Sequence, residues 1–176
     1  LKNQKEALLD KIRFLYVGRL SPEKGIFDFI KMFDKMDFDK INLKAEFAIV
    51  GNSENKNISN RNIKLIGYVA DSQSLINIYD NHNITVLPSF TEATPYVVDE
   101  SLARKRPVII FEDIDYVVRG KQGIFVTKRD VNSFSKTTKY VIDNYQEIQK
   151  KMEKNVLPTK KNMIKQISDI IKLQNS

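Results

Sequence analysis

Short apolar runs, most of them followed by a glycine, a proline or an acidic loop, recur along the first two thirds of this 176-residue chain. They are rich in valine, isoleucine, leucine and phenylalanine, which is typical of strands buried on both faces of a sheet. Residues with the period of an amphipathic helix lie between several of them. The runs are 13–17, 46–50, 63–66, 84–87 and 108–111, and the helical stretches are 26–33, 72–80 and 96–104. This alternation predicts an α/β fold, a Rossmann-like doubly wound parallel sheet with helices on both faces.

The last third of the chain is expected to be helical. One apolar face contains Phe134, Val141, Tyr145, Ile148 and Met152, and a second amphipathic period follows the proline at position 158 and runs to residue 171. The sheet is therefore predicted to end in a helical C-terminal segment.

Composition excludes several kinds of site. The chain has no cysteine and only one histidine, so disulfides, zinc-thiolate sites, cysteine nucleophiles and multi-histidine metal sites are ruled out. No apolar run approaches the roughly 20 residues that span a bilayer. We expect neither a membrane span nor a signal peptide in this sequence.

The net charge of +7 is distributed unevenly. Lysines and arginines balance the acids up to residue 120, so the whole excess belongs to the helical end. The lysines there are not interleaved with aromatic residues as in a nucleic-acid platform, and we expect no nucleic-acid partner. A basic helical end is compatible with peripheral contact with an anionic membrane.

The loop after the first run reads GRLSPEKG and leads directly into a helix. Its two glycines permit tight turns, the helix start offers free N–H groups at the positive end of its dipole, and Arg19 and Lys24 add two cations. This loop predicts a binding site for an anion such as a diphosphate. The alternative is that both cations are solvated and that Glu23 pairs with one of them.

A second polar loop follows the fourth run and reads PSFTEATPYVVDE. Pro95 suits the first position of the next helix and Thr94 its N-cap, so the N–H groups of Tyr96 and Val97 are expected to be free. Glu92 then lies in the loop beside these donors. An ionised carboxylate at this place can accept hydrogen bonds from the hydroxyls of a sugar or a ribose.

In order along the chain stand VGRLSPEKG, IVGN, IGYV and VLPSFTEATPYVVDESLARKRPVI. Together they resemble the C-terminal, donor-binding domain of GT-B glycosyltransferases of the retaining group 1 family (GT4), including the Glu-x7-Glu pair of Glu92 and Glu100. The resemblance covers nearly the whole chain and implies one half of a GT-B fold. Residues 12–176 would form the nucleotide-sugar-binding domain, with C-terminal helices in 133–176. Residues 1–11 would be a linker from an N-terminal acceptor domain that this chain lacks.

The resemblance also implies roles for particular residues. Arg19 and Lys24 would hold the diphosphate, Gly18 would let the backbone approach it, and Glu92 would contact hydroxyls of the donor sugar. Arg19, Lys24 and Glu92 are therefore the catalytic candidates, and Glu100 would contact the ribose unless it is merely a solvated helix residue. Further donor-binding candidates are Asn52, Gly67, Tyr68, Val69, Thr94, Tyr96 and Val97.

The chain departs from the family pattern at two places. Many members have glycine where this chain has Ala93 and Pro95, and because proline donates no N–H, Tyr96 and Val97 would have to supply the donors. The acidic segment 112–115 stands where a glycine-rich loop is common. Whether that segment contacts the donor is left open by the sequence.

Two D-x-D patterns, at 37–39 and 113–115, match the metal-binding motif of the other glycosyltransferase fold. The resemblance instead implies metal-independent catalysis, with Arg19 and Lys24 in the role of the cation. We expect no metal and no cofactor, and a UDP- or GDP-sugar as the donor. Glycoside hydrolysis also uses paired carboxylates, but no second feature of the sequence supports it.

The expected activity is transfer of a sugar, with retention, from a nucleotide diphosphate sugar to a hydroxyl of a glycan or glycolipid acceptor. By analogy with the family, the pathway would be bacterial envelope biosynthesis, such as lipopolysaccharide core or capsule, in the cytoplasm or on the inner face of the membrane. This chain alone should bind the donor but transfer nothing without its N-terminal domain. The alternative is a degenerate donor domain that acts only as a binding or interaction module.

Overall fold

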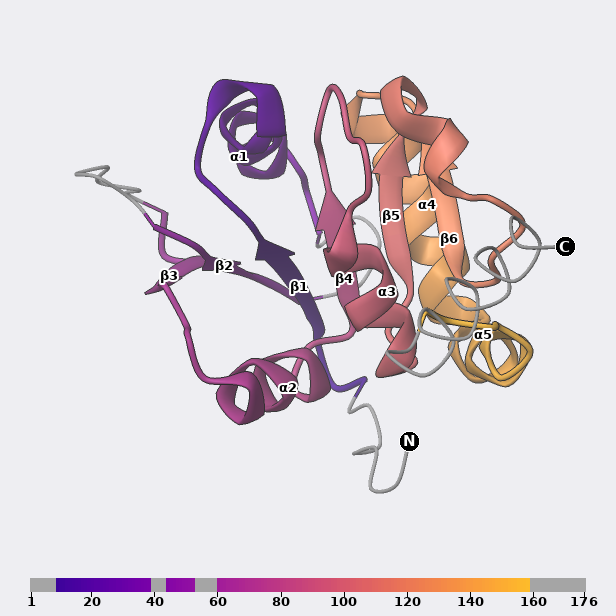
Figure 1. Ribbon diagram of the computed structural model, residues 1–176. Helices are drawn as coiled ribbons and strands as arrows, with labels where there is room; N and C mark the ends of the chain where they lie inside the picture. The colour runs from indigo at the N-terminus through magenta and orange to yellow at the C-terminus, as the bar shows by residue number, and fades with distance from the viewer. Residues whose placement is uncertain (1–8, 39–43, 53–59, 159–176) are drawn as a thin grey trace, which may run out of the picture.

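The computed structural model describes residues 9–38, 44–52 and 60–158. Six strands form one parallel sheet in the order β3-β2-β1-β4-β5-β6 (Figure 1). The predicted doubly wound sheet is confirmed. The strands are β1 Ile12–Val17, β2 Ala45–Val50, β3 Ile63–Gly67, β4 Ile84–Leu87, β5 Val108–Phe111 and β6 Ile124–Thr127.

Strand β6 is not among the strands that the sequence predicts. It lies at one edge of the sheet and pairs only with β5. Its residues are mostly half-buried, and the side chain of Val126 is 40% exposed. An edge strand of this kind lacks the uniformly buried, apolar character by which the central strands β4 and β5 are recognised.

Five α-helices and two short 3-10 helices connect and follow the described strands. The α-helices are α1 Ile26–Asp34, α2 Ser72–Asp80, α3 Tyr96–Ala103, α4 Val131–Asp143 and α5 Tyr145–Met152, and the 3-10 helices are η1 Pro22–Lys24 and η3 Glu112–Val117. The apolar face predicted for the last third is confirmed as buried, but it is shared by two helices that meet at Asn144. The predicted helix beyond the proline at position 158, and most of the predicted linker, fall outside the described residues.

One face of the sheet carries an aromatic core. The ring of Phe29 in α1 lies 5.1 Å, centroid to centroid, from that of Phe47 in β2 and 5.1 Å from that of Phe134 in α4. Phe134 also stacks on Phe111 of β5 at 6.1 Å. Helices α1 and α4 therefore cover the same face of the sheet.

Helices α2 and α3 cover the opposite face. Tyr79 of α2 packs in a smaller cluster with Leu15, Ala48 and other side chains of β1 and β2. The Ser101 hydroxyl of α3 donates to Thr85 at 2.7 Å, and Thr85 is the register partner of Leu15. Because paired residues of a parallel sheet point to the same face, α3 lies on the α2 side, and the predicted covering of both faces is confirmed.

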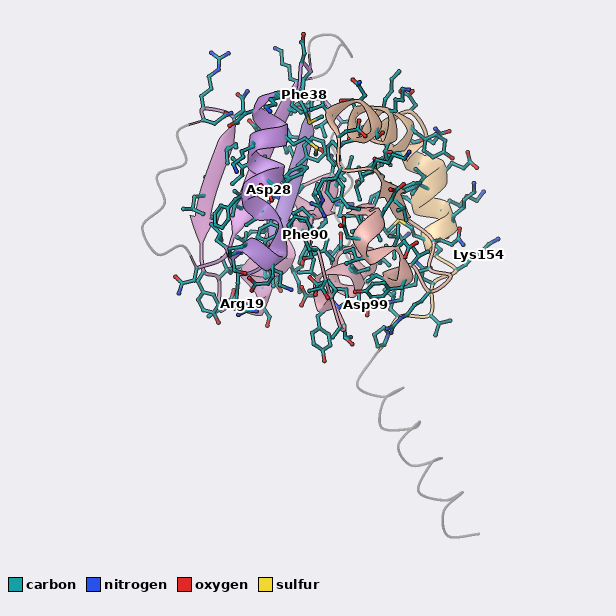
Figure 2. The ribbon with its side chains drawn as sticks, turned by 90° about the horizontal axis from the view of Figure 1, so that it is seen from above. Arg19, Asp28, Phe38, Phe90, Asp99 and Lys154 are labelled. Atoms are coloured by element: carbon teal, nitrogen blue, oxygen red, sulfur yellow. The ribbon has the colours of Figure 1, made fainter. Side chains whose placement is uncertain are left out.

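The strand order reverses between β1 and β4, which are neighbours in the sheet. The chain leaves β1 toward α1 on one face and leaves β4 toward α3 on the other face. In open parallel sheets, ligands bind at the carboxyl ends of the strands where connections diverge in this way. Figure 2, which shows the molecule from above, has Arg19 near the rim and Phe90 nearer the centre.

Candidate functional site

The start of helix α1 is held against the loop after β4. Gly25 is the N-cap of α1 and has a φ of 61°, and a β-carbon at this position would lie 2.0 Å from the carbonyl oxygen of Pro88. Only glycine fits so close a contact between two backbones. No side chain caps α1, and the start of a helix is the positive end of its dipole, which favours a nearby anion.

Hydrogen bonds join the ends of β1, β2 and β3 side by side. The N–H of Gly18 donates to the Val50 carbonyl at 2.9 Å, and the N–H of Gly51 donates to the Gly67 carbonyl at 3.0 Å. A β-carbon on Gly51 would lie 1.9 Å from the Gly18 oxygen. The structure thus brings several donor-binding candidates to one edge of the sheet, namely Gly18, Asn52, Gly67, Tyr68 and Val69, of which Tyr68 is 74% exposed.

Lys24 forms a largely buried ion pair between the loops after β1 and β4. Its Nζ lies 2.7 Å from Glu92 Oε1, and the Lys24 and Glu92 side chains are 22% and 7% exposed. The hydroxyl of Ser89 donates to the same oxygen at 2.6 Å. The loops after β1 and β4 are therefore joined by two of the three catalytic candidates that the sequence analysis names.

Arg19 is placed differently. Its side chain is 78% exposed, and its Nη2 lies 3.6 Å from Glu23 Oε1. Its backbone is fixed by the buried Tyr16, whose hydroxyl donates to the Arg19 carbonyl oxygen at 2.5 Å. The alternative that Glu23 pairs with one cation of this loop therefore holds for Arg19, while the guanidinium itself faces solvent.

The acidic 3-10 helix η3 braces the Glu92 loop. The hydroxyl of Tyr116 accepts the N–H of Glu92 at 2.9 Å and donates to the Glu92 carbonyl at 2.7 Å. One tyrosine thus holds both backbone polar groups of a catalytic candidate. Sequence reasoning missed Tyr116, because a tyrosine within an acidic loop carries no signal of a contact 24 residues away.

Arg129, which follows β6, is a second residue that sequence reasoning missed. Its guanidinium donates to the Pro88 carbonyl at 2.9 Å and to Asp113 Oδ2 at 2.6 Å, and lies 4.1 Å from the centroid of the Phe90 ring. It therefore fixes the loops after β4 and β5 together. The only sequence signal was its place after a strand, and that strand was not predicted.

Helix α3 begins at Tyr96, as the predicted stretch 96–104 does, but its cap is Pro95 and not the predicted Thr94. Pro95 is its N-cap, with φ −78° and ψ 95°, and no side chain, including that of Thr94, caps the helix. The fixed φ of proline suits either position, and this ψ value keeps Pro95 outside the helix. Tyr96 is 71% exposed at the start of α3, followed by the half-buried Val97.

Glu100 lies on an exposed position of α3 but is not merely solvated. Its Oε2 accepts a hydrogen bond from the buried hydroxyl of Tyr79 in α2 at 2.8 Å. The second glutamate of the Glu-x7-Glu pair is therefore oriented by a side chain of the neighbouring helix.

Within the described residues, no three histidine or acidic side chains group as ligands for a metal ion. Of the two D-x-D patterns, Asp113 is paired with Arg129, and residue 39 lies outside the described part. The described helices include none long and apolar enough to cross a membrane.

A hollow of about 540 Å³ lies at the opposite, amino edge of the sheet. It is lined by Arg13, Glu46, Arg61, Lys64, His82 and neighbouring residues. None of the candidate site residues contributes to it. This hollow and the predicted site residues therefore lie at opposite edges of the sheet. The candidate site is the group of predicted residues at the carboxyl edge.

Comparison with known proteins finds relatives in sequence and in fold. A capsular polysaccharide biosynthesis glycosyltransferase, CapM, from Staphylococcus aureus is 30% identical over 142 residues, which cover 73% of this chain and 36% of that protein. Sucrose-phosphate synthase from Thermosynechococcus elongatus has a similar fold, with a TM-score of 0.71 at 17% identity over 94% of this chain and 46% of that one. The Anabaena protein HepE, solved in complex with UDP and glucose, aligns with a TM-score of 0.62 at 17% identity over 81% and 42%.

The chain thus spans less than half the length of these relatives. The family model described as glycosyl transferases group 1 matches residues 1–157, and the resemblance of the motifs to group 1 glycosyltransferases is confirmed. The chain belongs to the group 1 family of glycosyl transferases.

Proposed function

We propose that this chain binds a nucleotide diphosphate sugar at the carboxyl edge of its sheet, as the donor-binding part of a retaining glycosyltransferase. One observation carries the proposal. The uncapped start of α1 and the Lys24–Glu92 pair meet where the strand order reverses, and Arg19 projects beside them. The positive end of a helix dipole, two cations and a carboxylate close together suit a diphosphate linked to a polyhydroxylated group.

The two cations would divide the work on the diphosphate. Lys24 is held in place by Glu92, so it offers a fixed charge, whereas Arg19 is exposed and would swing from Glu23 onto a phosphate. As the bond to the sugar breaks, negative charge grows on the departing diphosphate, and both cations and the α1 amides stabilise it. Glu92 Oε1 accepts from Lys24 and Ser89, which leaves its second oxygen to accept a hydroxyl of the donor sugar.

Neighbouring loops would bind the nucleoside. Glu100 would accept a ribose hydroxyl, the backbone of Gly67, Tyr68 and Val69 would receive the base, and Asn52 would lie beside it. The first amides of α3, at Tyr96 and Val97, would add donors close to Thr94. The UDP and glucose bound to HepE support a UDP-sugar among the candidate donors, and the same site chemistry admits a GDP-sugar.

The acceptor and the cellular setting are proposed from the relatives. CapM is a capsular polysaccharide glycosyltransferase, and another solved relative, WaaB, is a lipopolysaccharide outer core galactosyltransferase. We infer a glycan or glycolipid acceptor of the bacterial envelope, held by an N-terminal domain, in the cytoplasm or at the inner membrane face. Lys151 of α5 would contribute less than a free lysine to membrane contact, because it pairs with Glu147 at 2.7 Å.

The test is calorimetric titration of the 176-residue chain with UDP, GDP and their sugars. We expect one nucleotide series to bind, and Arg19→Ala to weaken it by about 1.5 to 3 kcal/mol. Arg61→Ala is the matched control, since it removes the same exposed group from the amino edge. No heat with any nucleotide would favour the alternative, a degenerate donor domain that serves only in protein interaction.

The proposal has two further consequences that can be assayed directly. Nucleotide affinity should be the same with and without a chelator, because cations of the protein replace a metal ion. The chain alone should transfer no sugar, because closure of two domains is needed to exclude water and place the acceptor. Loss of binding in chelator would contradict the first statement, and transfer by residues 1–176 alone would contradict the second.

A further inference from the structure

The hydroxyl of Tyr79 reaches from helix α2 to the carboxylate of Glu100 on α3. The two oxygens lie 2.8 Å apart. Tyr79 is 2% exposed, and its ring is packed against Leu15, Ala48 and Val50 beneath the carboxyl half of the sheet. A buried side chain thus ends in a polar atom at an exposed acid.

Both ends of Tyr79 are fixed. Its carbonyl oxygen accepts a hydrogen bond from the buried Arg106 at 3.3 Å, and the same guanidinium donates to the Asp80 carbonyl at 2.8 Å. Arg104 makes two further bonds, of 2.8 and 2.6 Å, to the Asp80 carboxylate. The end of α2 is therefore anchored to the segment that follows α3, and the Tyr79 hydroxyl has a defined position.

Glu100 has no such anchor of its own. It is an exposed side chain with several rotatable bonds, and ordering a side chain of this kind costs conformational entropy. Within the described part of the chain, its hydrogen bond with Tyr79 occupies Oε2 and leaves Oε1 open. Burial, together with the charge of Glu100, raises the pKa of Tyr79 above its ordinary range, so the hydroxyl keeps its proton and acts as the donor.

We propose that Tyr79 is a positioning residue for Glu100, which holds the carboxylate so that its free oxygen meets a ribose hydroxyl of the bound nucleotide. The proposal rests on the proposed function, in which Glu100 contacts the ribose. It adds that the orientation of this acid is supplied by α2, through a hydroxyl that touches no ligand. Preorganisation of this kind increases affinity by reducing the entropy lost on binding.

The test is the variant Tyr79→Phe, which removes the hydroxyl and keeps the buried ring. The matched control is Tyr145→Phe. Tyr145 is also 2% exposed, and its hydroxyl donates to the Asn83 carbonyl at 2.7 Å, at the amino edge of the sheet. Each variant of the full 176-residue chain is titrated with UDP and GDP and with the 2′,3′-dideoxy form of the nucleotide that binds.

Tyr79→Phe should weaken binding of the ribonucleotide by about tenfold, as expected for loss of a hydrogen bond to a charged group. It should leave affinity for the dideoxynucleotide unchanged. Tyr145→Phe should leave the ratio of the two affinities as in the wild type. In a Glu100→Ala background, Tyr79→Phe should have no further effect on nucleotide affinity.

The possible outcomes distinguish failure of the Tyr79 proposal from failure of the proposed function. Equal losses for both nucleotides, or a tenfold loss that persists without Glu100, would show that Tyr79 acts through the packing of α2 and would overturn the proposal. Unchanged ribonucleotide affinity in Tyr79→Phe would also overturn it while leaving the proposed function intact. A wild-type chain that binds neither UDP nor GDP would overturn the proposed function and this inference together.

Discussion

Replacement of Lys24 by methionine should destabilise the fold, whereas replacement of Arg19 by alanine should not. From the sequence, Arg19 and Lys24 have the same predicted role. In the structure, however, the Lys24–Glu92 pair is mostly buried and Arg19 is 78% exposed. Removing one partner of a buried pair leaves an uncompensated charge and costs about 3 to 5 kcal/mol. Here the remaining Ser89 bond and the partial exposure of Lys24 reduce the expected loss to about 2 kcal/mol.

The assay is equilibrium unfolding in urea, followed by circular dichroism. With a slope of about 2 kcal/mol per molar urea, Lys24→Met should lower the midpoint by about 1 M. Arg19→Ala should move it by less than about 0.3 M, because exposed ion pairs contribute little.

A double-mutant cycle identifies the cause. Glu92→Gln removes the charge and keeps a hydrogen-bond acceptor for Ser89, so Lys24→Met should cost less than about 0.5 kcal/mol in that background. The coupling energy between Lys24 and Glu92 is then about 1.5 kcal/mol. An unchanged cost in the Glu92→Gln background, or a midpoint shift no larger than that of Arg19→Ala, would refute the reasoning from burial.

Three further variants test other parts of the structure. Gly25→Ala should lose about 3 kcal/mol in the same urea assay, because its β-carbon would meet the Pro88 carbonyl at 2.0 Å in a left-handed conformation; a loss below 1 kcal/mol would contradict that contact. Arg106→Met should lose about 2 to 3 kcal/mol, since it removes the buried guanidinium that donates to the Asp80 carbonyl at the end of α2; a neutral effect would contradict this role of Arg106. Burial lowers the pKa of His82 from 6.5, so the unfolded chain binds more protons and stability should fall as pH drops from about 7 through the lowered pKa. His82→Gln should flatten that part of the stability-against-pH curve, and an unchanged slope would refute the role of His82.

The sequence was most informative where strands are buried on both faces. Strands β4 and β5 were found from runs of four largely apolar residues, all of them buried, and α2 was predicted with its observed bounds. The half-exposed β6 was missed, since burial on one face only leaves a weaker pattern. Because β6 was missed, no functional residue was expected in the loop that follows it, which contains Arg129.

The candidate site shows the same division between local and long-range information. The glycines and cations of the loop after β1 lie close together in sequence, and their place before a helix could be predicted from the local pattern. The pairing of Lys24 with Glu92 joins residues 68 positions apart, and Tyr116 contacts Glu92 across 24 positions. Contacts of this kind depend on the strand order of the sheet and have no local signal.

The most direct test of the central claim is to map nucleotide binding by NMR on the isotopically labelled 176-residue chain. Titration with UDP or GDP should shift the amide signals of Gly18, Gly25 and Ile26 at the start of α1, and those of Tyr96 and Val97 at the start of α3. Signals that line the hollow at the amino edge, such as Arg61, Lys64 and His82, should not move. Shifts confined to that hollow, with the carboxyl edge unchanged, would contradict the assignment of the donor site.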